Sequence, residues 1–336
     1  MYHPFTSLIL AELAPQLGIR LELEPNYQFA GELIFPNGRR HLFHNTNFNL
    51  NGAAARHIAD DKGYTAHFLR KHGFAVPQHQ SFFCAGVNAK LPPPRQRTLS
   101  DAQAYAATLG YPVFIKPNNL SQGAFVTKVH DAAQLLEVGQ QIFAHTDVLL
   151  VEQALSGRDY RVVVLAGQVM AAYERIPLSV VGDGRQDIDA LLQQARAAWH
   201  QQGRANAGID AQDSRIDAKL QQQGMKRASK PAVGQRVLLL DNANLSTGGS
   251  SFDLGDAIHP GFAELAVRAS ATLGLTLAGV DFIAADLCAA PDAQDWHILE
   301  LNAAPGLENY AALGPGQHAR VVELYRQVLQ LLAQRD

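Results

Sequence analysis

Apolar side chains recur along the chain with two periods, one typical of strands and one typical of helices. Alternating or short apolar runs predict strands at 111–117, 148–153 and 161–175, the last of which reads as a hairpin that turns at Gly167. Further strands are expected at 19–24, 28–35, 275–286 and 297–302. Helical spacing predicts helices at 6–17, 51–73 (two short ones), 100–109, 131–143, 188–199, 262–273 and from 319 onward. This mixture predicts an α+β or α/β protein with several lobes.

Composition narrows the class of protein. The 336 residues are 47% hydrophobic and 18% charged, enough for a large core divided among two or three lobes. A net charge of -3 without any Lys/Arg run argues against a nucleic-acid partner. No apolar window approaches the roughly 18 residues of a membrane span, and Cys84 and Cys288 are the only cysteines, so a cytoplasmic location is expected. A homo-oligomer such as a dimer is compatible with these features.

Two strands near the C-terminus carry polar side chains where burial is otherwise expected. The segments 275–286 and 297–302 are close in sequence and predict an antiparallel pair. Because side chains alternate between faces, the pairing brings Asp281, Glu300 and Asn302 together on one face. The apolar face is expected to carry Val280, Phe282, Leu299 and Leu301.

The clustered carboxylates need a compensating charge or solvent. Two carboxylates about 4 Å apart repel by roughly 4 kcal/mol at an effective dielectric constant of about 20. A hard divalent cation removes this repulsion, and carboxylate and carboxamide oxygens are the ligands that Mg²⁺ prefers. The alternative is that this face is simply exposed to water.

Five stretches together resemble the ATP-grasp superfamily, in particular the amide-forming domain of cyanophycin synthetases and of bifunctional glutathione-synthesis enzymes. The resemblance covers about residues 55–330, and the order and spacing of the motifs make it specific. The motifs are DKGYTAHFLRKHGFAVP, YPVFIKP, VLLVEQALSGRDYRV, DNANLSTGG, and AGVDFI with LELNAAPG. The resemblance implies an ATP-grasp fold that holds the nucleotide between two α/β lobes, at 56–150 and 151–336. Residues 1–55 lie outside the resemblance, and their own pattern predicts a small N-terminal α/β region.

The resemblance also implies roles for individual residues. Asp281, Glu300 and Asn302 match the ligands of the magnesium ions that bridge the ATP phosphates, with two ions expected and Mn²⁺ as an alternative. The nucleotide contacts it implies are phosphate binding by Lys62 and Lys116, adenine contacts at Glu152 and Leu155, ribose contacts at Asp159, and a loop over the triphosphate that includes Ser121 and Gly123. Each residue also has an ordinary structural interpretation, such as a solvated lysine, an ion pair of Asp159 with Arg158 or Arg161, or a plain turn.

The reacting end of the site is expected around Asn244 in the motif DNANLSTGG. These nine residues contain one large apolar side chain, so they are not expected in a core, and Gly248 and Gly249 are expected to present backbone N–H groups to an anion. A surface turn is the alternative. Relatives often carry an arginine where this chain has Leu240. A cation for the reacting phosphoryl group is therefore expected from Arg175 or Arg215.

The activity implied is that of an ATP-dependent carboxylate–amine ligase that acts on an amino acid or a short peptide. ATP phosphorylates a carboxylate, an amine attacks the acyl phosphate, and an amide, ADP and phosphate are released. Such chemistry depends on positioning and charge neutralisation. No GxxxxGK[ST] loop occurs, so one ATP site is expected. The alternatives are a small-molecule kinase of the same fold and a nucleotide-binding protein without turnover.

Overall fold

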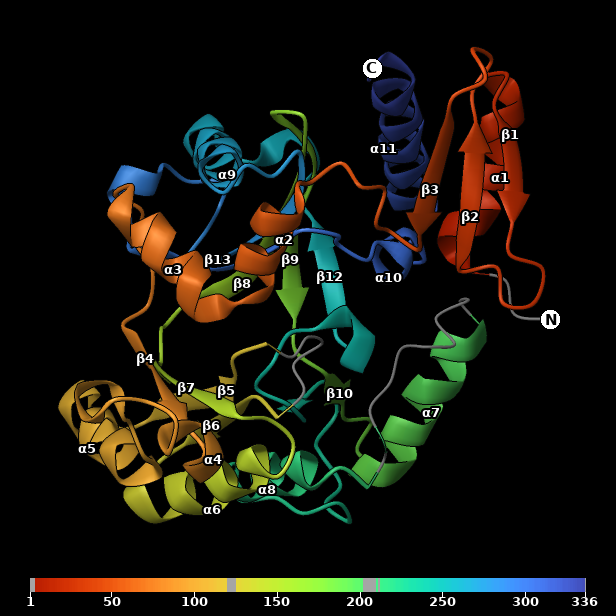
Figure 1. Cartoon of the computed structure of the whole chain (residues 1–336). Helices are drawn as coiled ribbons and strands as arrows, with labels where there is room; N and C mark the ends of the chain where they lie inside the picture. Colours follow the sequence, from red (N-terminus) through yellow and green to blue (C-terminus); the bar gives the residue numbers. More distant parts are fainter. Residues whose placement is uncertain (1–3, 120–124, 202–209, 211, 336) are drawn as a thin grey trace.

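The computed structural model describes residues 4–119, 125–201, 210 and 212–335. Within these residues the strands form four β-sheets with helices packed around them, as Figure 1 shows. No helix in this part of the chain combines the length and the hydrophobicity that crossing a lipid bilayer requires.

A five-stranded antiparallel sheet forms the centre of the molecule. Its order is β12 (Ser250–Asp253), β9 (Gln168–Ile176), β8 (Arg158–Leu165), β13 (Leu277–Ala284) and β14 (Trp296–Asn302). Three helices cover one face, namely α2 (Ala53–Asp60), α3 (Lys62–Lys71) and α9 (Pro260–Thr272). Val162, Val280 and Phe282 point into this core and are inaccessible to solvent. The hairpin predicted at 161–175 is confirmed as β8 and β9.

The opposite face of the central sheet is divided into an apolar end and a polar end. Val163, Leu165 and Leu277 lie at the apolar end and belong to the core that the N-terminal and C-terminal helices share. Arg161 and Asp281, on the same face one pleat further along, begin the polar end. The alternation of side chains along β8 and β13 therefore places an apolar core and a charged region on the same face of the sheet.

A four-stranded antiparallel sheet lies beside the central sheet (Figure 1). Its order is β4 (His79–Phe83), β7 (Val148–Gln153), β5 (Val113–Pro117) and β6 (Thr127–Val129). Helices α5 (Leu99–Leu109) and α6 (Ala132–Phe143) pack on it through a separate core that includes Phe82, Ile115 and Val151. A short helix α4 (Ala85–Asn88) and the 3-10 turn η1 (Pro93–Arg95) connect β4 to α5. The sheet carries Lys116 and Glu152 toward the central sheet.

A smaller unit extends from the end of β9. It consists of the strand pair β10 (Ser179–Val181) and β11 (Arg236–Leu238) with helices α7 (Ile188–Gln201) and α8 (Ser214–Gln222). The connections that follow contain the 3-10 turns η2 (Leu245–Thr247), η3 (Gly255–Ala257) and η4 (Pro291–Ala293). Leu240, where the resemblance implies an arginine in other members of the superfamily, is buried in the core of this unit.

The N-terminal elements pack against the C-terminal helix. Helix α1 (Phe5–Gln16) and the sheet β1 (Arg20–Leu23), β2 (Ala30–Ile34) and β3 (Arg40–His44) lie beside α11 (Pro315–Gln334), with α10 (Glu308–Ala311) beneath them (Figure 1). The hydroxyl of Tyr325 lies 3.2 Å from Oγ1 of Thr6, and its ring meets Phe48 edge-on at 5.6 Å. The two ends of the chain thus complete one core.

Several local expectations differ from the structure. The sequence favours Ser100 as the cap of the helix predicted at 100–109, but α5 is capped by Thr98, which forms a reciprocal capping box with Asp101. The strands β3, β4 and β12 do not appear among the predicted elements, because their sequences RHLFH, HQSFF and SSFD are too polar to show an apolar run. They form because neighbouring strands offer hydrogen-bonding edges.

Asn51, in the segment between β3 and α2, attaches this segment to the central sheet. Its side-chain amide donates to the carbonyl oxygens of Leu277 and Ala303, and its carbonyl oxygen accepts from the N–H groups of Thr276 and Leu277. Asn51→Ala should therefore lower the free energy of unfolding by about 2–3 kcal/mol, because backbone groups lose their partners. Urea unfolding measures this change. Gln193→Ala, at an exposed position of α7, should change the value by less than about 0.5 kcal/mol.

Candidate functional site

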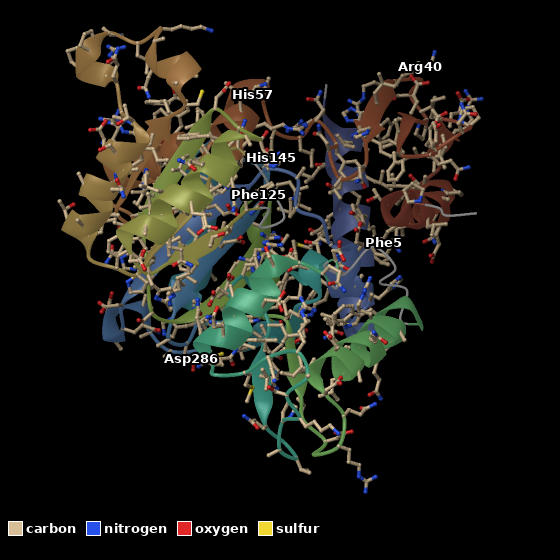
Figure 2. The ribbon with its side chains drawn as sticks, turned by 90° about the horizontal axis from the view of Figure 1, so that it is seen from below. Phe5, Arg40, His57, Phe125, His145 and Asp286 are labelled. Carbon is tan, nitrogen blue, oxygen red and sulfur yellow. The ribbon has the colours of Figure 1, made fainter. Side chains whose placement is uncertain are left out.

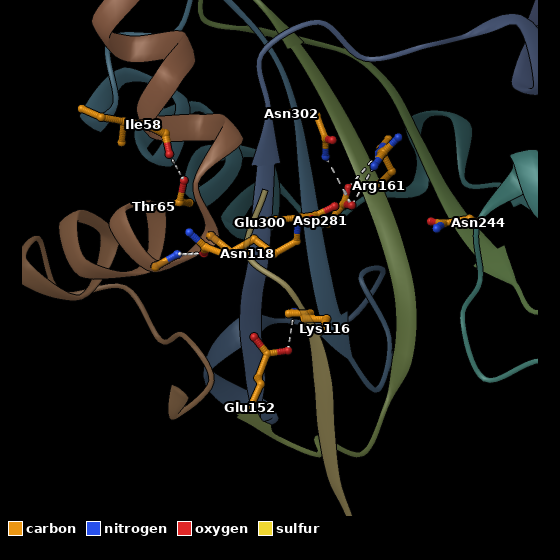
Figure 3. A network of polar contacts seen from close by, with 12 residues as sticks. Ile58, Thr65, Lys116, Asn118, Glu152, Arg161, Asn244, Asp281, Glu300 and Asn302 are labelled. Carbon is orange, nitrogen blue, oxygen red and sulfur yellow. Dashed lines mark hydrogen bonds and ion pairs between the residues drawn. The ribbon is translucent and has the colours of Figure 1, made fainter. Parts of the chain in front are cut away.

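A cleft of about 760 Å³ lies over the polar end of the central sheet. This volume is in the range typical of small-molecule sites. Its walls come from the four-stranded sheet, from strands β8, β9, β13 and β14, and from the segments 241–246 and 304–309. Figure 3 shows its central side chains converging from these elements.

The register of β13 and β14 places the polar residues of the cleft. Asp281 lies directly opposite Glu300, and Gly279 lies opposite Asn302. Nδ2 of Asn302 reaches 3.5 Å from Oδ2 of Asp281, so the two strands bring the three predicted metal ligands together (Figure 3). The predicted pairing of the two strands is confirmed.

A β-bulge changes which apolar residues accompany them. The register shifts between Asp281 and Phe282, so that Phe282 faces Ile298. Ile298 and Leu301 are buried in the core, whereas Leu299 lines the cleft. The expectation that Leu299 shares the apolar face of Leu301 is therefore wrong, because strict alternation does not survive an inserted residue.

Asp281 is completely buried and is held by two guanidinium groups. Arg161 forms a bidentate contact with it, in which Nε donates to Oδ1 and Nη2 donates to Oδ2, each at 2.7 Å. Nη2 of Arg175 lies 2.8 Å from Oδ2. Burial would lower the pKa of Arg161, but the adjacent carboxylate of Asp281 outweighs burial and raises it. This ion-paired group is the charged centre of the site.

Asp159 shares Arg175 with Asp281. The carboxylate lies opposite Arg175 in the strand pair β8–β9, and Oδ1 is 2.7 Å from Nη2 of the guanidinium. Burial raises the pKa of Asp159 to about 6, against the opposing effect of Arg175. The sequence leaves an ion pair with Arg158 or Arg161 open, but the structure gives the partner as Arg175. The implied ribose contact of Asp159 is untested and stays a prediction.

Lys62 and Glu300 form the next pair. Nζ of Lys62 lies 3.6 Å from Oε2 of Glu300, whose side chain is 29% exposed. Although burial opposes ionisation, the positive charges of Lys62, Lys116 and the two arginines hold the pKa of Glu300 at about 2. The carboxylate is therefore ionised across the physiological pH range.

Lys116 forms a buried pair with Glu152. Nζ donates to Oε1 at 2.7 Å across strands β5 and β7, and both side chains are less than a tenth exposed (Figure 3). Leu155 lines the same end of the cleft. The structure therefore brings Lys62, Lys116, Glu152 and Leu155 into one cleft with the carboxylates of the central sheet.

The segment 241–249 borders the other end of the cleft. Oδ1 of Asn244 lies 3.5 Å from Nη1 of Arg175, which places Asn244 beside the charged centre. Leu245 is part of the large core, and Gly248 and Gly249 are also buried. The N–H groups of these glycines donate to the carbonyl oxygens of Leu245 and Asn244. The expectations that this segment stays out of a core and that its glycine N–H groups face an anion are therefore wrong, because Leu245 is buried and the turn uses these N–H groups internally.

One predicted residue lies elsewhere in the described structure, and two others fall on residues that the structure does not describe. Arg215 pairs with Asp213 at 2.8 Å on α8 and is not among the described residues that line the cleft. Ser121 and Gly123 lie outside the described residues. Phe125, the first described residue after them, stacks on His145 with ring centroids 4.6 Å apart, and Figure 2 shows the two rings side by side.

Sequence reasoning missed Arg161 and Glu308 as residues of the cleft. Arg161 is the first residue of the run RVVVL. Because it lies two residues before Val163, alternation along the strand could have predicted that both side chains lie on the same sheet face. Glu308 follows the Pro-Gly turn in a segment without periodicity, so nothing in the sequence shows which way it faces. Asn118, whose Nδ2 donates to Asp61 at 2.7 Å, supports the start of α3 next to Lys62.

The donor set suits a hard divalent cation. Glu300 is ionised, and Asn302 and Asp281 add further oxygen atoms on adjacent strands. Among the described contacts, Oδ1 of Asp281 accepts one hydrogen bond from Arg161, which leaves acceptor capacity on this oxygen. No group of three His, Cys, Asp or Glu side chains suited to a metal occurs in the part of the chain that the structure describes. Any ion here therefore depends on the carboxamide and on other ligands.

Comparison with known proteins places this fold and cleft in a family. Residues 72–227 match the family model of the D-ala D-ala ligase C-terminus. The glutathione biosynthesis bifunctional protein GshAB of Mannheimia succiniciproducens is 31% identical over 261 residues, which are 74% of this chain and 32% of that protein. The cyanophycin synthetase of Geminocystis herdmanii is 30% identical over 276 residues, covering 80% of this chain and 30% of that protein.

A solved structure agrees with these matches. The bifunctional glutathione synthetase from Pasteurella multocida superimposes with a TM-score of 0.57 at 27% identity, covering 91% of this chain and 41% of that one. The chain belongs to the ATP-grasp superfamily and has its fold. It spans about a third of the length of the curated relatives that it matches.

The buried pair of Lys116 and Glu152 predicts an asymmetric effect on stability. Lys116→Met should lower the free energy of unfolding by about 3–5 kcal/mol, because it leaves the Glu152 carboxylate buried without a partner. The double variant with Glu152→Gln should recover most of this loss. Urea unfolding of the single and double variants measures both changes, and equal losses in the two proteins would contradict the assignment of the pair.

Proposed function

We propose that the chain is an ADP-forming carboxylate–amine ligase that makes an amide bond on an amino acid or a short peptide. The observation that carries this proposal is that Asp281, Glu300 and Asn302 line the same cleft as Lys62 and Lys116. The nucleotide would lie between the lobes 56–150 and 151–336, with the adenine end at Glu152 and Leu155. Membership of the ATP-grasp superfamily supports this assignment.

The charge of the cleft supports a requirement for divalent cations. The described lining contains six Lys or Arg side chains and eight Asp or Glu side chains, so the fully ionised lining has a net charge of -2. A triphosphate adds further negative charge to this site. Asp281, Glu300 and Asn302 would hold Mg²⁺, which would neutralise the phosphate oxygens and orient them.

The residues of the chain would then act by position. Lys62 and Lys116 would bind phosphate oxygens, for which they would exchange part of their contact with Glu300 and Glu152. Arg175 is fixed between Asp159, Asp281 and Asn244, and it would stabilise charge that develops on the transferred phosphoryl group. The acyl phosphate would form at this point, and an amine would displace phosphate from it. Arg161 would position Asp281 throughout.

The first experiment measures ADP release with Mg²⁺ over pairs of carboxylates and amines, followed by mass spectrometry of the product. A ligase releases ADP only when both partners are present and yields their condensed product. ADP release with a hydroxylated acceptor alone, together with a phosphorylated product, would assign the protein to the kinases and refute the proposal.

Glu300→Gln should reduce Mg²⁺-dependent turnover by at least about 100-fold, because it removes an ionised oxygen ligand. The protein should still fold, but the unfolding free energy should fall by up to about 3 kcal/mol, because the cations that hold the pKa of Glu300 at about 2 favour its ionised form by about this amount. Turnover assays and thermal unfolding measure the two effects. Turnover equal to that of the wild type would contradict the metal assignment.

Lys116 should contribute to ATP affinity independently of its structural role. The double variant Lys116→Met with Glu152→Gln keeps the buried site neutral, and it should bind ATP at least about tenfold more weakly, as expected for loss of one charged contact. Calorimetry with ATP and Mg²⁺ gives the affinity. Glu152→Gln alone is the control, and equal affinities in the two variants would argue against a phosphate contact.

A further inference from the structure

Glu308 lies in the cleft on a firmly held element. It begins α10, and the residues around it, Leu307, Tyr310 and Ala311, belong to the large core. The ring of Tyr310 stacks on Tyr173 at 4.4 Å, and its hydroxyl donates to Oδ1 of Asp253 at 2.8 Å. The backbone that carries Glu308 is therefore held in place by the large core.

Glu308 differs from the other acids of the cleft in its charge environment. Each of the other seven acidic residues of the described lining has an ion-pair partner. The pairs are Asp60 with Arg56, Glu152 with Lys116, Asp159 with Arg175, Glu174 with Arg158, Asp241 with Lys219, Asp281 with Arg161, and Glu300 with Lys62. No Lys, Arg or His among residues 4–119, 125–201, 210 and 212–335 forms such a pair with Glu308. Burial alone raises the pKa of its carboxyl group.

The position of Glu308 assigns it to one end of the cleft. Helix α10 packs beside η2, and Leu307 and Leu245 share one core. Asn244 immediately precedes η2 and contacts Arg175 at 3.5 Å. The wall that carries Glu308 thus borders the place proposed for the reacting phosphoryl group. A carboxylate here would repel phosphate oxygens, so it does not suit the nucleotide itself.

We infer that Glu308 is a specificity residue that binds a second positive charge on the amine substrate, so that this substrate is a diamine or a basic amino acid. This inference rests on the proposed ligase function. The attacking amine must lose its proton before it forms the amide, so the charge that stays with Glu308 is a different one. A partly desolvated carboxylate gains most from a ligand that supplies its missing cation. An acidic amine substrate would meet repulsion at the same position.

The test compares amines that differ in this charge alone. With the carboxylate identified by ADP release, kcat/KM is measured for 1,4-diaminobutane against 1-aminobutane and for lysine against norleucine. The wild type should prefer the doubly charged member of each pair by at least about tenfold, the effect of one charge-assisted hydrogen bond. Glu308→Gln should abolish most of this preference, chiefly through KM, and leave kcat/KM for the monoamines within about twofold.

Charge reversal and a surface control sharpen the result. Glu308→Arg should shift the preference toward glutamate and aspartate as amines. Glu264→Gln, at an exposed position of α9, should leave every preference unchanged. Calorimetry with ADP, Mg²⁺ and 1,4-diaminobutane gives a readout without turnover, in which Glu308→Gln should bind the diamine at least about tenfold more weakly.

The outcomes separate this inference from the ligase function. A ligase in which Glu308→Gln leaves the preference unchanged, or slows all amines equally in kcat, would overturn the inference and leave the ligase function intact. A preference that follows the charge of the carboxylate partner would overturn it as well. ADP release that requires neither a carboxylate nor an amine would instead refute the proposed function.

Discussion

The charged centre of this protein depends on one buried carboxylate. Asp281 has no exposed surface, and an isolated ionised carboxylate in such a position would cost several kcal/mol. The bidentate contact of Arg161 and the further contact of Arg175 make the ionised form tolerable. Arg175 in turn ties Asp159 and Asn244 to the same centre. The geometry of both ends of the cleft therefore follows from the way in which a single charge is compensated.

This arrangement also bears on how the cleft would accept a ligand. Five of the six lysines and arginines in the described lining, all but Lys128, already pair with carboxylates, so phosphate oxygens would compete with these carboxylates for the same donors. Preformed ion pairs keep the side chains in fixed positions, which reduces the ordering that binding requires. The same pairs reduce the net attraction for an anion, which is why divalent cations belong to the proposed function.

Much of this architecture follows from patterns in the sequence, and the reasons for the remainder are specific. The hairpin β8–β9 and the facing of Asp281 and Glu300 are consequences of apolar runs and of alternation, both of which are local. The bulge that turns Leu299 into the cleft is not local, because it depends on how β14 meets its neighbours. The ion-pair partner of Asp159 depends on the register between β8 and β9. The sequence alone does not give this register, so it does not decide which of the nearby arginines pairs with Asp159. The internal hydrogen bonds of Gly248 and Gly249 accompany the burial of Leu245, and the polar composition of the segment indicates neither.

The shared core of the two chain ends has a consequence for the order of folding. One apolar cluster includes residues near both ends of the chain, the first being Ile9 on α1 and the last Leu332 on α11. The two helices are direct neighbours in it. During synthesis the first helix leaves the ribosome long before its partner exists, and domains otherwise tend to fold from the N-terminal end. The apolar residues of α1 must therefore remain without their partner until α11 has been synthesised. The four-stranded sheet, whose core lies within residues 82–151, is free to fold in the meantime.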